Sequence, residues 1–409
     1  MSLLNKTPVR PKRPHTPFGR PSAVWSAARI SLTAFFAVDG FLFASWVVRI
    51  PDVRAQVHAS HSALGLALLC ISAGAVATMP VIGRLCVRFG SRLVTVASLA
   101  VLSLAVVLPP HTHSVATLGA ALLLFGAGYG GANVAMNSAA VELVAELRRP
   151  VMPSFHAGYS LGGLLGAAVG GLLAGSLTAA WALALSGALG LLVTVAAGLV
   201  LLRSEPSAPP VVRRADPAAP AAAAGAHVRL LVLLLGLTAL FTAYGEGALA
   251  DWATLHLTDD VHASAGLAAF GYAAYAAAMT AGRLGGTWLS IRLGTTRVMV
   301  AGGLTACAGM LVAALTPSLP LVLGGFVLVG LGLSNLFPLA IARAGALGGP
   351  QGVAAASTLG YGGMLIGPPV IGFLADAASL PAALTTVAAA GAAAAVLAVV
   401  VNRTGPGAR

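Results

Sequence analysis

The chain is a succession of long apolar runs separated by short polar segments. An α-helix needs about 20 apolar residues to cross a bilayer, so each run predicts one membrane span. We predict twelve spans, at residues 30–50, 62–83, 93–110, 116–140, 154–177, 179–202, 229–256, 264–289, 297–315, 319–342, 353–375 and 379–402. The eighth and twelfth have the weakest signal, because alanine dominates them and is barely apolar enough.

One segment breaks this pattern near the middle of the chain. Residues 203–227, RSEPSAPPVVRRADPAAPAAAAGAH, combine proline, alanine and charge and cannot bury a core, so we expect a flexible cytoplasmic linker. The predicted fold is therefore all-α, with two six-helix bundles at residues 26–202 and 228–402. Short tails, a disordered basic one at 1–25 and another at 403–409, complete the chain.

Composition agrees with a membrane protein. The 409 residues are 58% hydrophobic and only 8% charged, whereas soluble proteins carry about 25% charged residues. The net charge of +12 does not indicate nucleic-acid binding, because the arginines lie between apolar runs and form no basic helix. The 3 cysteines lie inside apolar runs without CxxC spacing, so we expect no metal and no cofactor. With no catalytic motif or nucleotide-binding loop either, we expect no enzyme.

The positive charges indicate how the chain is oriented. With twelve spans, only Arg49 and Arg54 of the 23 lysines and arginines fall on one side, which leaves 21 on the side of both termini. Basic loops remain in the cytoplasm, so we expect both termini to be cytoplasmic in a multi-pass protein of the cell inner membrane.

The two halves resemble each other at an offset of about 202 residues. Gly128, Gly130 and Asn133 recur with the same spacing as Gly330, Gly332 and Asn335. The loop sequences LCVRFGS and LSIRLGT correspond, as do DGFLFASW and EGALADW. Such a duplication places a site at the interface between the halves.

The loop IGRLCVRFGSRLV, residues 82–94, resembles the signature of the major facilitator superfamily. Residues of this loop and two acids of span four form a predicted cytoplasmic gate, in which the acids could pair with Arg84 and Arg88. The gate residues are Gly83, Arg84, Arg88, Gly90, Arg92, Glu142 and Glu146. Val87 stands where the signature has an acidic residue. The segments SWVVRIP and EGALADW further resemble the YbjJ-type, fucose-permease-like bacterial inner-membrane branch.

Asp39 lies in the middle of the first span. A carboxylate at that depth needs a partner, a wet cavity or a function, and we favour a functional role over local satisfaction by neighbouring hydroxyls. Such an acid can bind and release a proton as the site alternates between the two sides of the membrane. The resemblance implies the same role, because the fucose-permease group has a proton-coupling aspartate on span one. Its second acid, on span four, is replaced here by Asn133 and Asn137.

Three asparagines are candidates for the cavity. Asn133 and Asn137 share one helix face and suit a hydroxyl-bearing ligand, although asparagine equally joins membrane helices. Asn335 occupies the repeat-related position and favours a cavity.

Span seven carries two acids, Glu246 and Asp251, which point about 140° apart on an ideal helix. Glu246 is the deeper and the second proton-coupling candidate, whereas Asp251 is nearer the outer surface. Trp46 and Trp252 follow the acids of each half and either stack on a ligand or anchor the helices at the interface.

The remaining polar candidates are weaker. Tyr159 and Tyr361 offer hydroxyls to the cavity from glycine-rich helices. His156 is expected to make a capping or loop contact near the cytoplasmic end, and the six histidines of the outer loops, His256 among them, are expected to be solvated. Arg49 and Asp52 are expected to form a structural ion pair.

These observations predict a secondary transporter that moves a small polar or sugar-like solute by alternating access, with proton coupling. An exporter of drugs or secondary metabolites driven by proton exchange is an alternative, and a non-transporting membrane sensor is a remote one. The expected partners are the solute, protons and the lipid bilayer, and the chain is expected to act as a monomer.

Overall fold

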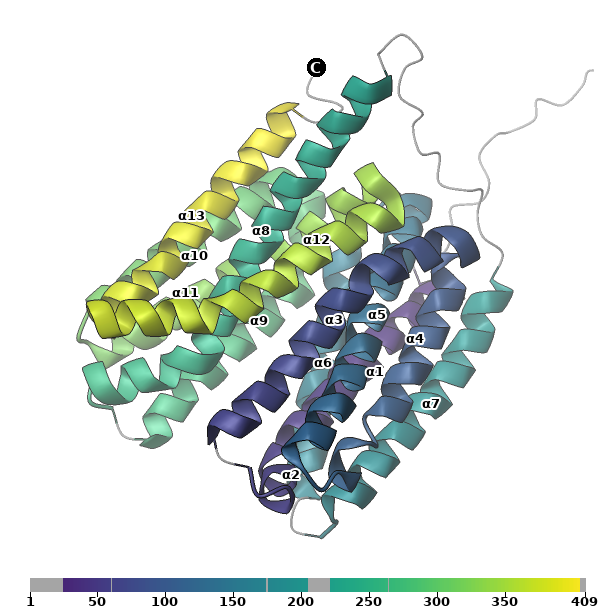
Figure 1. Ribbon diagram of the computed structural model, residues 1–409. Helices are drawn as coiled ribbons and strands as arrows, with labels where there is room; N and C mark the ends of the chain where they lie inside the picture. The colour runs from purple at the N-terminus through teal and green to yellow at the C-terminus, as the bar shows by residue number, and fades with distance from the viewer. Residues whose placement is uncertain (1–24, 60, 174–175, 205–220, 264, 405–409) are drawn as a thin grey trace, which may run out of the picture.

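The computed structural model describes residues 25–59, 61–173, 176–204, 221–263 and 265–404. Helices form two bundles (Figure 1). The first consists of α1 (Ala27–Val48), α2 (Ile50–Gln56), α3 (His61–Phe89), α4 (Ser91–Ala105), α5 (Val115–Leu147), α6 (Met152–Leu172) and α7 (Ala179–Arg203), with a 3-10 turn at Pro109–His111. The second consists of α8 (Ala221–Leu255), α9 (Ala265–Leu293), α10 (Thr295–Leu315), α11 (Leu319–Leu333), α12 (Leu336–Ala377) and α13 (Leu380–Thr404), with a π-helical turn at His256–Asp260.

The twelve predicted spans are confirmed, but the tenth and eleventh are built differently from the others. The tenth consists of α11 and the first part of α12, which are separated at Ser334–Asn335. α12 then turns at Gly349, whose φ of 58° favours glycine, and continues as the eleventh span. By length and hydropathy alone, the described residues contain 9 candidate spans, and one of them, Leu319–Ala377, covers both of these.

The predicted boundaries of the tails and the linker are only partly described. Residues 1–24, 205–220 and 405–409 lie outside the described ranges. Residues 221–227, which we assigned to the linker, instead form the first turns of α8. The end of α7 and the start of α8 lie at the same end of the molecule as the C-terminal end of α13, where His227 contacts the Thr404 carbonyl. We call this the linker end.

Glycines bring α1 and α6 into close contact. A Cβ atom at Gly40 would collide with the Tyr159 carbonyl, and one at Gly162 would collide with the Ala37 carbonyl. Small residues are used in this way in membrane proteins. Lipid provides no hydrophobic force that drives helices together, so close van der Waals packing holds them in contact instead. The contact fixes the backbone of α1 at Gly40, the residue after Asp39, against α6.

The two bundles are in close contact at the linker end. There Gly83 of α3 lies against Pro350 and Ala354 of α12, and Gly345 lies against Val141 of α5. One apolar core runs through the first bundle and includes residues of α8 and α12 at this end, whereas a second core contains only residues from 244 to 390. The structure is therefore closed by apolar packing at the linker end.

We expect Gly162→Ala to destabilise the protein by about 1–3 kcal/mol, because the added methyl group overpacks the contact between α1 and α6. The measurement is the midpoint of thermal unfolding in detergent. Gly163→Ala is the matched control, since a Cβ there would make only ordinary contact. Equal midpoints for the two variants would contradict the packing described here.

Candidate functional site

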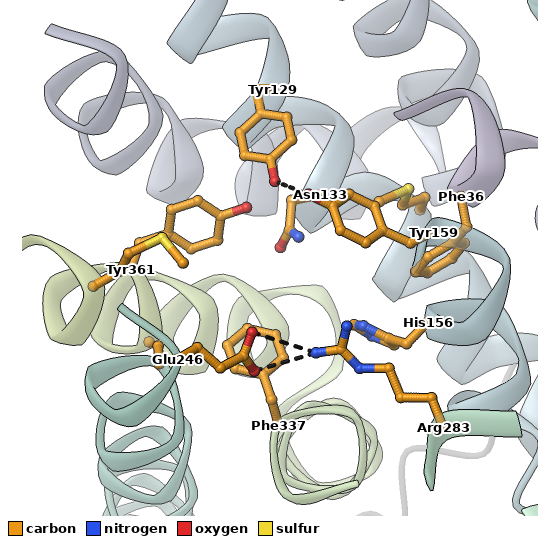
Figure 2. A pocket seen from close by; sticks show the side chains of 13 residues that line it. Phe36, Tyr129, Asn133, His156, Tyr159, Glu246, Arg283, Phe337 and Tyr361 are labelled. Carbon is orange, nitrogen blue, oxygen red and sulfur yellow. Dashed lines mark hydrogen bonds and ion pairs between the residues drawn. The ribbon is translucent and has the colours of Figure 1, made fainter. Parts of the chain in front are cut away.

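A cavity of about 100 Å³ lies between the two bundles (Figure 2). Both halves of the chain line it, as the repeat predicts. The lining residues are Phe36, Tyr129, Asn133, Met136, His156 and Tyr159 from the first bundle and Ala243, Glu246, Arg283, Phe337, Gly360, Tyr361 and Met364 from the second. Rings and methionines make most of this wall apolar, and a few polar groups converge on it, as is typical of a small-molecule site.

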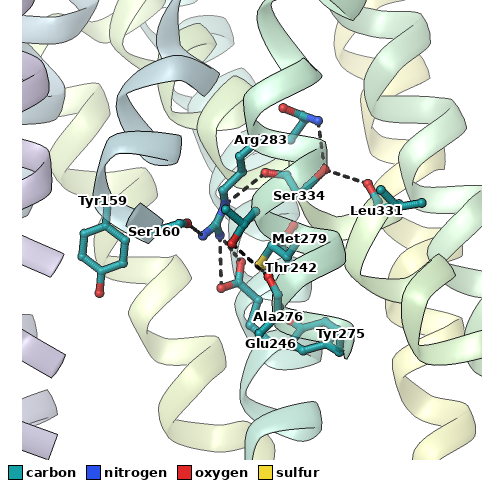
Figure 3. A network of polar contacts seen from close by, with 12 residues as sticks. Tyr159, Ser160, Thr242, Glu246, Tyr275, Ala276, Met279, Arg283, Leu331 and Ser334 are labelled. Atoms are coloured by element: carbon teal, nitrogen blue, oxygen red, sulfur yellow. Dashed lines mark hydrogen bonds and ion pairs between the residues drawn. The ribbon is translucent and has the colours of Figure 1, made fainter. Parts of the chain in front are cut away.

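Arg283 is the centre of the polar network at this cavity (Figure 3). Its Nη2 donates to the two carboxylate oxygens of Glu246 at 3.2 and 3.4 Å. Its Nη1 donates to Ser160 Oγ at 2.9 Å. Because Ser160 belongs to α6 and Arg283 to α9, this hydrogen bond joins the two bundles beside the cavity.

The break between α11 and α12 supplies the third contact of Arg283. In a continuous helix the Ser334 carbonyl would accept a hydrogen bond from residue 338, but Pro338 has no N–H to donate. Arg283 Nε donates to this carbonyl instead, at 3.4 Å. Backbone groups freed at membrane depth need such replacement partners. The proline therefore helps to determine where the guanidinium lies.

Aromatic rings close the cavity from both sides. The Tyr129 and Tyr159 hydroxyls are hydrogen-bonded at 2.7 Å, and the ring of Tyr129 lies 6.0 Å from that of Tyr361 in the other bundle. His156 packs between Phe36 and Phe337, with ring centroids at 5.3 and 5.9 Å. The contacts of Tyr129 with Tyr361 and of His156 with Phe337 cross the interface between the bundles, so movement of either bundle changes the walls.

His156 and Asn137 form a hydrogen bond behind this wall. His156 Nε2 lies 3.2 Å from Asn137 Oδ1, and Asn137 Nδ2 donates to the Asn133 carbonyl at 2.8 Å. Because an amide oxygen can only accept, Nε2 carries the hydrogen and Nδ1 remains able to accept from a ligand in the neutral ring. The amide of Asn137 is thus a support for His156.

Asp39 lies beside the cavity and is not among its lining residues. The side chain is fully buried, and neither carboxylate oxygen has a hydrogen-bond partner in the described part of the chain. Electrostatic interactions link it to the hydroxyls of Tyr129, Tyr159 and Tyr361. All three tyrosines line the cavity.

The structure brings three of the predicted cavity residues together and separates the others. Asn133, Tyr159 and Tyr361 line the cavity, and so does Glu246, the second proton-coupling candidate. Five predicted residues do not line it. Asn137 supports His156, and the amide of Asn335 donates to the Gly282 carbonyl at 3.0 Å. Trp46 and Trp252 pack within their own bundles, and Asp251 is exposed.

The residues of the predicted gate lie at the linker end but pair differently from our expectation. Glu142 accepts from Ser91 at 2.7 Å, and Glu146 pairs with Arg92 at 3.3 Å. Arg84 and Arg88, for which we expected these partners, are both exposed. The role of this region in gating stays a prediction.

Two residues of the site were missed by the sequence analysis. Arg283 was counted among loop residues although it lies within the predicted span 264–289, and it is buried at the cavity. His156 was assigned a capping or loop contact but lines the cavity. The rule that identified Asp39, an ionisable residue inside a span, would have found both.

The outer polar residues give one correction and one agreement. His256 is buried, with its ring nitrogens 2.8 Å from Asp260 and 3.0 Å from the Ala313 carbonyl, so it is not a solvated loop residue. The expected ion pair between Arg49 and Asp52 is present at 3.1 Å.

Known proteins with similar sequences include membrane transporters. Residues 30–250 and 235–409 each match the Major Facilitator Superfamily. An uncharacterised transporter of Sinorhizobium fredii is 34% identical over 391 residues, which cover 91% of this chain and 97% of that protein. An uncharacterised MFS-type transporter of Yersinia pestis is 34% identical over 366 residues, with 88% and 92% covered.

The fold is also found among solved structures. FucP in the outward conformation superposes with a TM-score of 0.78 at 17% sequence identity, covering 92% of this chain and 99% of that one. FucP is the fucose:proton symporter of E. coli. At this identity the likeness shows the architecture of two six-helix bundles.

We expect Arg283→Gln to lower the free energy of unfolding by about 1–3 kcal/mol, because Glu246 then keeps a largely buried charge without its partner. Adding Glu246→Gln should recover part of this loss, so that a double-mutant cycle reports coupling. Thermal unfolding in detergent is the measurement. Arg292→Gln on the exposed face of α9 is the control. Strictly additive effects would contradict the network.

Proposed function

The chain belongs to the major facilitator superfamily of membrane transporters, and we propose that it carries a small polar solute across the membrane by alternating access, coupled to protons. The observation that carries this proposal is Asp39, a fully buried acid without a hydrogen-bond partner in the described chain, placed beside the cavity between the bundles. A carboxylate so placed is costly as an anion, so the conformation described here holds Asp39 in its protonated form.

The cavity supports a polar solute without net charge. The positive charge of Arg283 is balanced by Glu246 at 3.2 Å. Asn133, His156 and the two hydrogen-bonded tyrosines offer donors and acceptors suited to hydroxyl groups. Phe36 and Phe337 provide apolar faces on which a small ring can pack. A polyhydroxylated ring, such as a sugar or a cyclic polyol, fits this combination.

The protonation state of Asp39 affects solute binding through the tyrosines. Asp39 interacts electrostatically with Tyr129, Tyr159 and Tyr361, so its charge acts on the hydroxyl groups of the cavity wall. When Asp39 loses its proton, the new negative charge changes the hydrogen bonding of these hydroxyls and thereby the binding of the solute. Glu246 is the second proton-coupling candidate, and its exchange requires that Arg283 first release it.

Alternation between the two sides follows from how the bundles are joined. In this conformation the linker end is closed by the packing of α3 and α5 on α12. The Arg283–Ser160 hydrogen bond and the aromatic contacts at the cavity must rearrange when the bundles rock. A solute that binds Arg283, Glu246 or the tyrosines acts directly on this interface.

The basic residues support placing the linker end in the cytoplasm of the cell. Two of the 23 lysines and arginines, Arg49 and Arg54, fall at the opposite end and Arg283 lies inside, which leaves 20 at the linker end by their position in the sequence. With this orientation the protein is closed to the cytoplasm in the state described. We take it to act as a single chain.

The test is transport by the purified protein in liposomes with an imposed pH gradient and a pH-sensitive dye inside. A panel of neutral sugars, cyclic polyols and apolar amines identifies a solute that moves protons. For that solute we expect Asp39→Asn to abolish accumulation against a gradient while leaving solute exchange at equal concentrations, because the amide mimics the protonated acid. Glu246→Gln should reduce gradient-driven accumulation of the solute.

Asp251→Asn is the matched control, because Asp251 is an exposed acid on the same helix as Glu246, and it should accumulate the solute normally. If Asp39→Asn and Glu246→Gln both retain full gradient-driven accumulation, the proton assignment is wrong. If only amines drive proton exchange, an exporter replaces the sugar-like carrier.

A further inference from the structure

The lateral face of the first bundle has a second, larger hollow. It has a volume of about 390 Å³, against about 100 Å³ for the central cavity, and is formed by α3, α4 and α5. Its walls include Ile82, Leu85 and Phe89 of α3, Leu93 and Val101 of α4, and Ala127 of α5. We call it the lateral groove.

The groove is apolar and faces outward. Phe89, Leu93 and Val101 are each 43–52% exposed. Along α3 it extends from Thr78 to Phe89, about 16 Å of helix at 1.5 Å per residue. This length is close to one leaflet of the hydrocarbon core, which is about 15 Å thick. The groove therefore fits an acyl chain lying along the bundle in the leaflet at the linker end.

A positive charge lies at the linker end of the groove. The guanidinium of Arg88 packs over the ring of Phe89, 5.1 Å from its centroid, and that ring is part of the groove wall. Arg88 is exposed, and no carboxylate in the described part of the chain forms an ion pair with it. Val87 occupies the preceding position, so the chain offers no acid there.

We propose that the lateral groove binds an anionic phospholipid, with an acyl chain in the groove and the phosphate at Arg88. Arg88 combines stacking on an aromatic ring with free donors for phosphate oxygens, a geometry that guanidinium provides. Glu142 and Glu146 do not compete for it, because they contact Ser91 and Arg92. The same helix, α3, packs on α12 at the linker end, so the groove adjoins the closed end of the transporter.

The proposal is tested by titrating the delipidated full-length protein in detergent with dioleoyl phosphatidylglycerol or dioleoyl phosphatidylcholine and measuring bound lipid by native mass spectrometry. The two lipids share their chains and differ in net charge. One basic residue near an anionic lipid is worth about fivefold in affinity, so we expect phosphatidylglycerol to bind about fivefold more tightly. Glycerol phosphate, which has no chains, should not displace it.

Two variants separate the headgroup from the chain. Arg88→Gln should remove the preference for phosphatidylglycerol, whereas Arg84→Gln, an exposed arginine on the same helix but away from the groove wall, should keep it. Ala97→Phe places a ring in the groove and should weaken both lipids equally. Ala97 is exposed, so this variant is expected to fold, and its thermal unfolding midpoint checks this.

Three results would overturn the proposal. One is an unchanged lipid preference in Arg88→Gln, which is a surface substitution and leaves the core intact. Another is unchanged affinity for both lipids in folded Ala97→Phe. The third is displacement of phosphatidylglycerol by glycerol phosphate, which would leave a simple phosphate site. None of these outcomes depends on the solute or on proton coupling.

Discussion

The structure depends on the cost of placing charge at membrane depth. No water in the hydrocarbon region solvates an ionised side chain, so each such group needs a partner or must give up its charge. Arg283 and Glu246 meet this demand as a pair at 3.2 Å beside the cavity. Asp39, buried and without a hydrogen-bond partner in the described chain, has no such pair, and we propose that it holds a proton instead. The two solutions lie on opposite sides of the same interface and set its chemistry.

A proline transmits this constraint from the backbone to the site. Pro338 leaves the Ser334 carbonyl without a helical donor, and α11 ends there. Arg283 binds that carbonyl and extends to Glu246 and to Ser160 of the other bundle. One side chain thus connects a broken helix, a balancing acid and the partner bundle. Discontinuous helices in transporters commonly lie at binding sites, because the freed backbone groups need polar hydrogen-bond partners.

Much of the fold was predictable from the sequence, because span length and arginine placement are imposed by the bilayer itself. The acids Asp39 and Glu246 were identified for the same reason. The pairing of Glu246 with Arg283 was not, since it requires knowing that α8 and α9 turn these faces toward each other. Asn335 was misjudged because the repeat predicts a symmetric helix, whereas Pro338 breaks only the second copy. Side-chain partners across helices depend on rotation, which composition and spacing leave open.

The central claim is that Asp39 carries a proton in this conformation and releases it during transport. Infrared difference spectroscopy of the protein in a lipid film, as the pH is raised or a transported solute is added, measures this directly. The account predicts loss of a protonated-carboxyl C=O band that is present in the parent and absent in Asp39→Asn. Spectra without such a band, or with the same band in both proteins, would contradict it.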